Sequence, residues 1–353
     1  MKTWDVVIVG GGIIGLSLAI ALRKRGSSVL VVERGEPGRE ASHAAGGMLV
    51  DCLLETPAAL QALATASARM YPEFTYELEV ESGGKVDLRD RGSIIFPSAE
   101  HLPLARASLQ PASVADLEPS LGPTGRDRLA FYLAERCVDP RALCAAAFKT
   151  AKRRGVDISS GDEVVTIDVS DGRAADVTTK KTAFHAAKVV NCAGAWSGQI
   201  GPHAFPTRPV KGQMLYLAMP SRTLLTHVIR SPEVYLIPRS DGRLLVGTTV
   251  EEAGFDKRTD ATTIQRLRRA AVDLVPKLAD ARILEDWAGL RPGTPDALPI
   301  LGETGTSGYY VATGHYRDGI LLAPVTAEVM AKVIEGCNPG HDLSAFSPAR
   351  FQS

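Results

Sequence analysis

The sequence predicts an α/β protein that carries a second, β-rich domain, and three observations lead to this prediction. Residues 5–34 have the pattern of a strand, a glycine-rich turn, a helix and a second strand. Later β-strand patterns do not alternate regularly with helices, and small-residue turns recur at 193–194 and 314–319. The chain has 353 residues, 45% of them hydrophobic, which is enough for about two domains.

The N-terminal unit has the pattern of a dinucleotide-binding motif. Residues 5–9 form a short apolar run that is typical of a buried parallel strand. Gly10, Gly12 and Gly15 match G-x-G-x-x-G: the first permits a tight turn, the second lets a pyrophosphate approach, and the third allows close helix packing. Glu33 ends the second strand, where a carboxylate can accept hydrogen bonds from ribose hydroxyls. An ordinary βαβ unit whose glycines serve only packing is the alternative.

The other elements follow from local patterns. Helices are expected over 57–83, from Pro140 to Arg154 after an Asp139 cap, over 261–278 and over 324–335. Strands are expected within 92–97, 156–181, 188–196, 207–250 and 308–314. Residues 40–49 form a small-residue loop or helix start, and residues 98–135 are loop-rich.

Composition and charge argue against several classes of protein. The 40 basic and 40 acidic residues balance, so no nucleic-acid partner is expected. No apolar stretch approaches the ~20 residues of a membrane span, and the N-terminus runs straight into the fold. We therefore expect a cytoplasmic protein with no membrane partner. The five cysteines are scattered without C-x-x-C spacing, so we expect reduced thiols and no metal site. They are Cys52, Cys137, Cys144, Cys192 and Cys337.

The distribution of the segments favours FAD over NAD. One complete glycine fingerprint leaves room for one dinucleotide, and several distant small-residue turns would converge on one extended cofactor. We predict an FAD-binding, Rossmann-like domain built from the discontinuous segments 1–85, 136–205 and 285–353. Residues 86–135 and 206–284 would form the β-rich (α+β) substrate-binding domain.

Nearly the whole chain resembles a known family. The segments AAGGML, VVNCAGAWS, VKGQMLYL, VYLIPR, GRLLVGTT, WAGLRPGTPDALPILG and GHYRDGILLAP follow the fingerprint in order. Together they resemble the FAD-dependent amino acid oxidases related to D-amino acid oxidase and sarcosine oxidase, and within them the glycine oxidases of thiamine biosynthesis. This resemblance implies FAD that is not covalently bound, because no cysteine lies near GHYRDGI, where the sarcosine oxidases carry theirs.

The resemblance also implies where the cofactor binds. The implied residues are Gly10, Gly12, Ile13, Ile14, Gly15, Glu33, Arg34, Ser42, Ala45, Gly46, Gly47, Met48, Val164, Ala193, Gly194, Trp196, Gly289, His315, Arg317, Asp318, Gly319, Ile320 and Leu321. A helix that starts near 318–320 is expected to direct its amide groups and positive dipole end at the flavin. The alternative is an ordinary tight turn.

The substrate site implied by the resemblance centres on Arg291. A guanidinium can hold an α-carboxylate in a bidentate contact, and Tyr235 would add a hydrogen bond. Arg317 would lie near the flavin or the mouth of the site. The alternatives are an ion-pair role for Arg291, a core position for Tyr235 and a surface position for Arg317. His315 is interpreted as structural.

The implied reaction is the oxidation of glycine, sarcosine or small D-amino acids by hydride transfer to the flavin. Oxygen would take up the electrons to give hydrogen peroxide, and the imine would hydrolyse or enter thiazole synthesis, in a homo-oligomeric enzyme. The alternatives are a D-amino acid dehydrogenase that uses an electron carrier and a flavin-binding subunit without catalysis. Two residues depart from the family pattern: Glu233 replaces an expected histidine, and Val250 an expected methionine. We expect Glu233 to face outward or to contact the substrate amino group.

Overall fold

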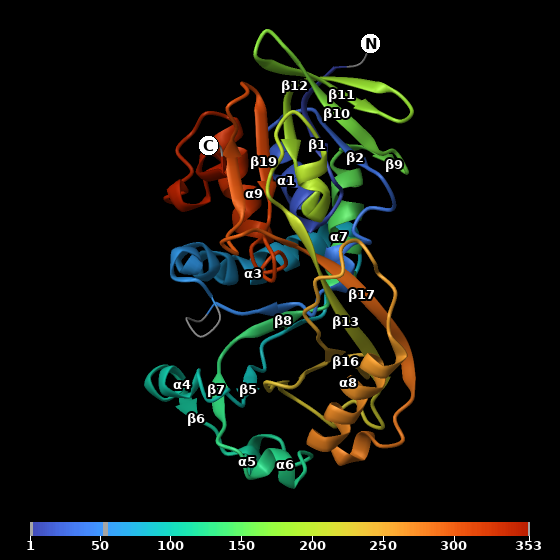
Figure 1. Cartoon of the computed structure of the whole chain (residues 1–353), viewed down its shortest axis with the longest axis vertical. Coiled ribbons are helices and arrows are strands. Elements are labelled where there is room, and N and C mark those ends of the chain that lie inside the picture. Colours follow the sequence, from blue (N-terminus) through green and yellow to red (C-terminus); the bar gives the residue numbers. More distant parts are fainter. Residues whose placement is uncertain (1–2, 52–55, 352–353) are drawn as a thin grey trace.

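The computed structural model describes residues 3–51 and 56–351, in which two large sheets lie one above the other (Figure 1). The upper sheet has the order β10-β11-β12-β1-β2-β9, with β19 paired to β12 and β18 paired to β19. Its strands are β1 (Thr3–Val9), β2 (Val29–Glu33), β9 (Asp157–Ser160), β10 (Val164–Ser170), β11 (Arg173–Thr179), β12 (Ala183–Asn191), β18 (Ile300–Glu303) and β19 (Tyr309–Thr313). The centre of the sheet is parallel, since β1 pairs in parallel with β2 and β12, and β12 with β19.

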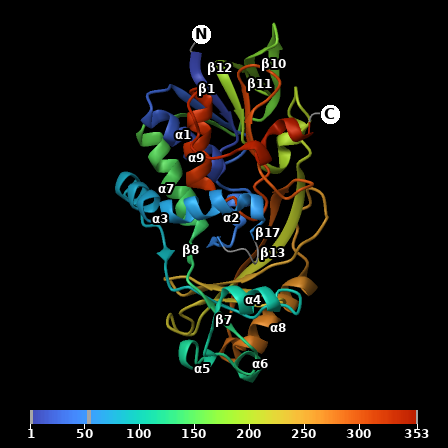
Figure 2. The same cartoon turned by 90° about the vertical axis from the view of Figure 1, so that its left-hand side faces the viewer.

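Helices cover one face of this sheet. They are α1 (Ile13–Lys24), α3 (Gln61–Ser82), α7 (Pro140–Arg153) and α9 (Ala323–Ile334), which gather beside the sheet in Figure 2. Successive side chains of β1 point to opposite faces, as they do in any strand. Val6 and Ile8 pack into the core beneath these helices, whereas Val7 and Val9 pack into a second core on the other face. The continuous apolar run in the sequence therefore reflects burial on both faces.

The lower sheet has the order β17-β13-β16-β15-β14-β5-β7-β6. Its strands are β5 (Ser93–Ile95), β6 (Gln110–Pro111), β7 (Phe131–Leu133), β13 (Arg208–Ala218), β14 (Val228–Arg230), β15 (Tyr235–Pro238), β16 (Arg243–Gly247) and β17 (Ile283–Gly293). The long antiparallel strands β13 and β17 extend from the lower sheet toward the upper one (Figure 1). Helix α8 (Ala261–Leu274) packs on the lower sheet through Ile264, Leu267 and Ala271.

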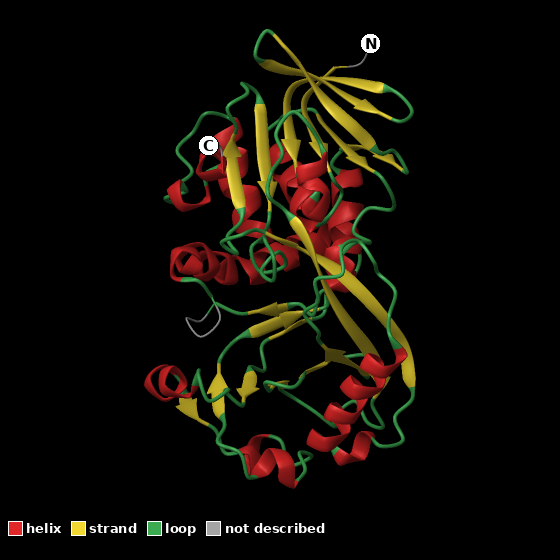
Figure 3. Cartoon of the chain, in the orientation of Figure 1, coloured by secondary structure: helices red, strands yellow, loops and turns green. Residues whose placement is uncertain are grey.

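Shorter elements connect the two layers. The strands β3 (Met48–Leu49), β4 (Leu88–Arg89) and β8 (Arg136–Val138) form a small third sheet. Short α-helices are α2 (Ala41–Ala44), α4 (Leu102–Ser108), α5 (Val114–Leu117) and α6 (Pro123–Arg126). Figure 3 shows α4, α5 and α6 beside the lower sheet, so the region expected to be loop-rich contains short helices.

The predicted fold class is confirmed, and most helix limits agree with the sequence patterns. Asp139 caps α7 by accepting a hydrogen bond from the backbone N–H of Arg141 at 2.9 Å. Two predicted limits are wrong. Helix α8 ends at Leu274 and a separate 3₁₀ turn covers Pro276–Leu278, because Pro276 has no N–H for the helix. Helix α9, Ala323–Ile334, agrees to within one residue with the helix predicted over 324–335, but no helix begins near 318–320.

Cys137, Cys144, Cys192 and Cys337 are free thiols, and Cys52 lies outside the described residues. The residue limits given above for the two domains stay a prediction.

Candidate active site

A cavity of about 1040 Å³ lies between the two sheets. It is lined by the glycine turn after β1, the loop over 40–48, the start of β10, residues 193–196 and the segment 314–320. From the lower sheet, β13, β15, β16 and β17 contribute side chains to the same cavity. Segments far apart in the sequence therefore meet around one elongated space.

The three fingerprint glycines have different roles in this structure. Gly10 has φ +107°, and a Cβ there would lie 2.5 Å from the carbonyl oxygen of Cys192. A Cβ on Gly15 would lie 2.1 Å from the Gly10 oxygen, so Gly15 serves the packing of α1 and does not line the cavity. Gly12 does line the cavity, and its missing Cβ would meet only Ser42 Oγ at 3.4 Å. The glycine turn is thus an open cradle at Gly12, which fits an approaching pyrophosphate.

Glu33 is fixed at the carboxyl end of β2. Its Oε2 accepts a hydrogen bond from the Gly11 N–H at 2.7 Å, and its Oε1 accepts one from the Gly35 N–H at 2.9 Å. The residue is 8% exposed and lines the cavity. Each carboxylate oxygen can accept more than one hydrogen bond, so this arrangement remains compatible with ribose hydroxyls.

The Arg34 guanidinium stacks on the Trp196 ring at the wall of the cavity. The guanidinium carbon of Arg34 lies 3.5 Å from the Trp196 ring centre, and the Phe255 ring lies 5.2 Å from that of Trp196. Arg34 Nη2 also contacts Glu40 Oε1 at 2.8 Å, and Lys257 Nζ contacts Glu40 Oε2 at 3.1 Å. Phe255 and Lys257, in the chain that follows β16, therefore contact two residues that line the cavity, Trp196 and Glu40.

The loop that contains Gly46 and Gly47 is held by Arg239, a residue to which the sequence patterns gave no role. Arg239 is fully buried and donates hydrogen bonds to the carbonyl oxygens of Gly46 (2.6 Å) and Val138 (2.9 Å). Gly47 has φ +80°, and a Cβ there would lie 2.0 Å from the Val138 oxygen. The sequence does hint at this role, because Arg239 directly follows the apolar run VYLIP. A cation within an apolar segment needs hydrogen-bond partners if it is buried.

Arg291 and Tyr235 line the opposite part of the cavity. Arg291 Nη2 donates to Thr248 Oγ1 at 2.9 Å and its Nη1 donates to the Thr249 carbonyl oxygen at 3.2 Å. Burial lowers the pKa of Arg291, yet a guanidinium stays charged at any working pH. Burial raises the pKa of Tyr235, against the opposing effect of the nearby Arg291 charge. Thr248 also lines the cavity. The sequence patterns did not identify it, because its position beside Arg291 depends on how distant strands pair.

Tyr235 has room for its ring because Gly247 stands opposite it in the register of β15 and β16. A Cβ on Gly247 would lie 2.8 Å from both the Tyr235 ring and Met214 Cγ. The Tyr235 hydroxyl faces Met214 Sδ at 3.5 Å, and Met214 lines the cavity. Tyr235 is therefore a wall residue of the cavity.

The segment 314–320 reaches the cavity through a turn. The Leu322 N–H donates to the Asp318 oxygen at 2.8 Å and closes a turn ahead of α9, so the helix start expected at 318–320 is wrong. His315 is buried, its Nε2 lies 3.1 Å from Thr326 Oγ1, and burial lowers its pKa to about 3. A neutral, packed imidazole agrees with the structural interpretation of His315. Arg317 lines the cavity and lies 5.2 Å from the Tyr316 ring centre.

Most residues named from the sequence meet in this cavity. Those that line it are Gly10, Gly12, Ile13, Ile14, Glu33, Arg34, Ser42, Ala45, Gly46, Gly47, Met48, Val164, Ala193, Gly194, Trp196, Tyr235, Gly289, Arg291, His315, Arg317, Asp318, Gly319 and Ile320. Gly15 and Leu321 do not. Leu321 is 1% exposed, and its carbonyl oxygen accepts a hydrogen bond from Ser67 Oγ at 2.6 Å, so it belongs to the core.

The two residues that depart from the family pattern lie at the rim. The Glu233 side chain is 57% exposed, and its Oε2 lies 3.2 Å from Arg128 Nη1. Val250 is 54% exposed and also lines the cavity. Glu233 therefore faces outward, which is one of the two orientations expected from the sequence.

Neither a metal centre nor a transmembrane helix is found in the described ranges. Within residues 3–51 and 56–351, no three His, Cys, Asp or Glu side chains are grouped as metal ligands. Over the same residues, the helices lack the length and apolar character that membrane crossing requires.

Comparison with known proteins gives a consistent result. A family model described as FAD dependent oxidoreductase matches residues 5–333. Glycine oxidase of Pseudomonas putida is 32% identical over 358 residues, covering 98% of both proteins. The bifunctional protein ThiO/ThiG of Trichormus variabilis is 35% identical over 99% of this chain, which spans only 55% of that protein. The crystal structure of glycine oxidase from Geobacillus kaustophilus matches with a TM-score of 0.93 and 32% identity, covering 99% of both chains.

The glycine cradle at Gly12, the carboxylate at the end of β2 and the small-residue loops all suit an extended dinucleotide, in agreement with the family match. Because the match covers most of the chain and near-full-length relatives exceed 30% identity, the chain belongs to the family of FAD-dependent oxidoreductases.

Proposed function

We propose that this protein oxidises glycine and other small amines with FAD, and that molecular oxygen is the electron acceptor. The observation that carries the proposal is the position of Arg291: a partly buried guanidinium faces the same cavity as the glycine cradle at Gly12. A small amino acid needs such an anchor, because its carboxylate is the strongest recognition group it offers. Sarcosine and small D-amino acids share that group and are proposed as further substrates.

The chain's own residues would bind and orient the substrate. Arg291 would hold the carboxylate through N–H groups that its two hydrogen bonds to Thr248 and Thr249 leave available, since a guanidinium has five. Tyr235 would donate a further hydrogen bond, because burial keeps its hydroxyl protonated. The exposed Glu233 avoids placing a negative charge against that carboxylate. Arg317 is proposed to lie close to the flavin.

The residues around Gly12, Glu33, Gly46 and 314–320 would hold FAD without a covalent bond. Bound FAD supplies the two-electron oxidation of the amine and returns the electrons to oxygen. The balanced reaction for glycine consumes oxygen and water and yields glyoxylate, ammonia and hydrogen peroxide. Positioning is the main requirement for such a step, which agrees with a site that would orient its substrate through the partly buried cation of Arg291.

The names of two relatives support a role in thiamine biosynthesis. One relative, 32% identical, is a glycine oxidase. Another, 35% identical, is the bifunctional protein ThiO/ThiG of Trichormus variabilis, of which this chain spans 55%. We propose that the imine formed here supplies thiazole synthesis, and that the protein acts in the cytoplasm as a homo-oligomer.

The test is hydrogen peroxide formation by the purified flavoprotein with glycine, sarcosine, D-alanine and D-proline. We expect peroxide with glycine, and we expect Arg291→Leu to lose at least about a hundredfold in kcat/KM because it removes a charged, bidentate contact. Oxidation of amines that reduces an artificial electron carrier but forms no peroxide would favour the dehydrogenase alternative. Failure to oxidise any of the four amines would overturn the proposal.

A further inference from the structure

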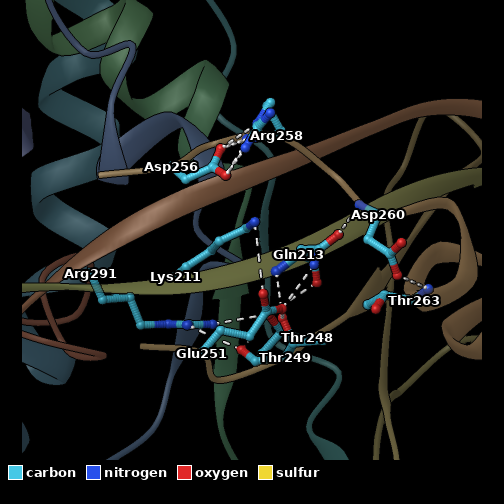
Figure 4. A network of polar contacts seen from close by, with 10 residues as sticks. All are labelled: Lys211, Gln213, Thr248, Thr249, Glu251, Asp256, Arg258, Asp260, Thr263 and Arg291. Carbon is cyan, nitrogen blue, oxygen red and sulfur yellow. Dashed lines mark hydrogen bonds and ion pairs between the residues drawn. The ribbon is translucent and has the colours of Figure 1, made fainter. Parts of the chain in front are cut away.

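A layer of polar side chains lies behind Arg291, outside the residues assigned to substrate or cofactor (Figure 4). It includes Lys211 and Gln213 on β13, and Thr248, Thr249 and Glu251 in the chain that follows β16. These residues come from β13, which pairs with the strand that carries Arg291, and from the chain after β16, so the layer can control where Arg291 points.

The chain after β16 contains one more residue than β13 beside Arg291, and we call this irregular segment, residues 248–250, the bulge. Met214 pairs with Gly247, and the next paired position is Lys211 with Glu251. Between these pairs β13 advances three residues while the other strand advances four. The extra residue bends the strand locally, a device that re-aims side chains next to active sites. Two backbone hydrogen bonds of 2.9 Å between Lys211 and Glu251 close the bulge.

Both observed acceptors of the Arg291 guanidinium belong to this bulge. They are Thr248 Oγ1, at 2.9 Å from Nη2, and the Thr249 carbonyl oxygen, at 3.2 Å from Nη1. Thr248 Oγ1 in turn donates to the Gln213 carbonyl oxygen at 3.2 Å. The direction of the free guanidinium edge therefore depends on where the bulge places these two oxygens.

Glu251 fixes the bulge through contacts with Thr249 and Gln213. Its Oε1 accepts hydrogen bonds from the Thr249 hydroxyl and from Gln213 Nε2, the latter at 2.9 Å. The Thr249 hydroxyl also accepts a hydrogen bond from the Gln213 backbone N–H at 2.9 Å. Because Thr249 is tied down through its side chain, its carbonyl oxygen can stay directed at Arg291.

The same carboxylate compensates a buried cation. Lys211 is 5% exposed, and its Nζ lies 3.7 Å from Glu251 Oε2. Val210, its neighbour in the sequence, pairs with Arg291 across β13 and β17. Two cations thus lie on adjacent strands, and Glu251 places a negative charge beside one of them. Hydrogen bonds and the Lys211 charge outweigh burial and lower the pKa of Glu251, so the carboxylate is ionised at neutral pH.

The layer continues to the start of α8. Gln213 Oε1 accepts a hydrogen bond from the Asp260 N–H at 2.7 Å, and Asp260 Oδ2 caps α8 by accepting one from the Thr263 N–H at 2.8 Å. Gln213 thereby ties the bulge to a helix terminus that is itself capped (Figure 4). The bulge is held from both ends.

We propose that Glu251 is a positioning residue: through Thr249 it holds the two oxygens that orient Arg291 toward the carboxylate of the substrate. The proposal rests on the function proposed above, in which Arg291 binds that carboxylate. It predicts a defect in substrate binding with little change in the chemical step, because Glu251 contacts Arg291 only through the bulge.

The experiment compares the flavin-loaded parent with Glu251→Gln, Thr249→Val and Thr249→Ser. Glu252→Gln is the matched control, since Glu252 is the next residue along and its exposed carboxylate pairs with Arg208 at 3.2 Å. Two quantities are measured: the steady-state kcat and KM for glycine, and the Kd of acetate from the change in flavin absorbance. Acetate carries the carboxylate without the amino group and cannot be oxidised.

We expect Glu251→Gln and Thr249→Val to raise both the glycine KM and the acetate Kd about tenfold, with kcat within about twofold. Thr249→Ser keeps the hydroxyl and should restore parental values, as should Glu252→Gln. Thr249→Val leaves the pair of Glu251 and Lys211 intact, so this variant still tests the positioning role if Glu251→Gln does not fold. Unchanged acetate binding in Thr249→Val, or an equal loss in Thr249→Ser, would overturn the proposal.

The acetate titration separates this proposal from the proposed function. If no amine is oxidised but acetate binding depends on Arg291, Thr249 and Glu251, the function is wrong and the positioning role stands. If glycine is oxidised and Arg291→Leu abolishes the activity, while Thr249→Val binds acetate as the parent does, the positioning role alone fails.

Discussion

The guanidinium of Arg291 lies directly against Gly212: a methyl group on Gly212 would come within 2.4 Å of both Nη atoms. Gly212 faces Gly289 across the pair of β13 and β17, and a Cβ on Gly289 would lie 2.4 Å from the Ala44 Cβ. Neither glycine has a positive φ, so close approach explains both. Gly212 makes room for the Arg291 side chain, and Gly289 makes room for Ala44 of α2.

Gly212→Ala should therefore displace Arg291 without unfolding the protein, because the group that must move is the end of a flexible side chain. We expect the KM for glycine to rise about tenfold or more, with the flavin content unchanged. Steady-state kinetics and the flavin absorbance of the purified variant measure both. Gly125→Ala in α6 is the control, since its Cβ would make only ordinary contacts of 3.4 to 3.7 Å with Leu121. Parental kinetics in Gly212→Ala would show that the guanidinium is not confined by this contact.

The second prediction separates the fingerprint glycines. Gly12→Ala adds a methyl group that the protein itself can accept, at 3.4 Å from Ser42 Oγ, but that projects into the cavity. We expect weaker FAD binding and an apoprotein of normal stability. Gly15→Ala places its methyl group 2.1 Å from a backbone oxygen, so we expect the free energy of unfolding of the apoprotein to fall by about 1–3 kcal/mol or more. Flavin fluorescence titration and thermal unfolding of the apoproteins distinguish the two, and equal effects of both substitutions would contradict the assignment.

Local signals in the sequence pointed to several residues that line the glycine-turn end of the cavity. Gly10, Gly12 and Glu33 are specified by short-range chemistry: a turn, a helix start and the end of a strand. The helix start expected near 318–320 failed, because Pro324 fits the first turn of a helix and α9 begins one residue before it. The stretch 318–322 forms only a turn that leads into that helix.

The substrate end could not be predicted from local patterns. Arg291 and Tyr235 were found through resemblance, and Gly212, Thr249 and Glu251 were not found at all. Their roles depend on which residue of β13 stands opposite which residue of β16 and β17, and on one bulge. Register and bulges depend on the pairing of strands that are far apart in the sequence, so a short stretch of sequence cannot predict them.

The third prediction concerns Glu233 at the rim. Its side chain is 57% exposed and pairs with Arg128, and surface ion pairs of this kind contribute little energy. Glu233→Gln should change kcat/KM for glycine by less than about twofold at moderate ionic strength. Parallel measurement of Arg128→Gln tests the partner. A loss of tenfold or more in Glu233→Gln alone would mean that the carboxylate reaches the substrate amino group, contrary to its outward position.

The last prediction concerns the response of stability to pH through His315. The folded protein holds this imidazole neutral, with a pKa lowered by burial to about 3, whereas an unfolded chain would have a pKa near 6.5. Below pH 6.5 the unfolded state binds a proton that the folded state does not, so the free energy of unfolding falls as the pH falls. The stabilising contribution is complete above pH 6.5 and disappears progressively toward pH 3.

Between pH 7.5 and 5.5, the parent should therefore lose about 1 kcal/mol more of its free energy of unfolding than His315→Gln, in which the titrating group is gone. Denaturant unfolding at the two pH values, with FAD in excess, measures this difference. Thr326→Val is the matched control, because it removes the hydrogen-bond partner at 3.1 Å from Nε2 but leaves the buried imidazole. That variant should be less stable at both pH values while it keeps the parental pH dependence. An identical pH dependence in His315→Gln and the parent would show that His315 is protonated in the folded protein or already shielded in the unfolded one.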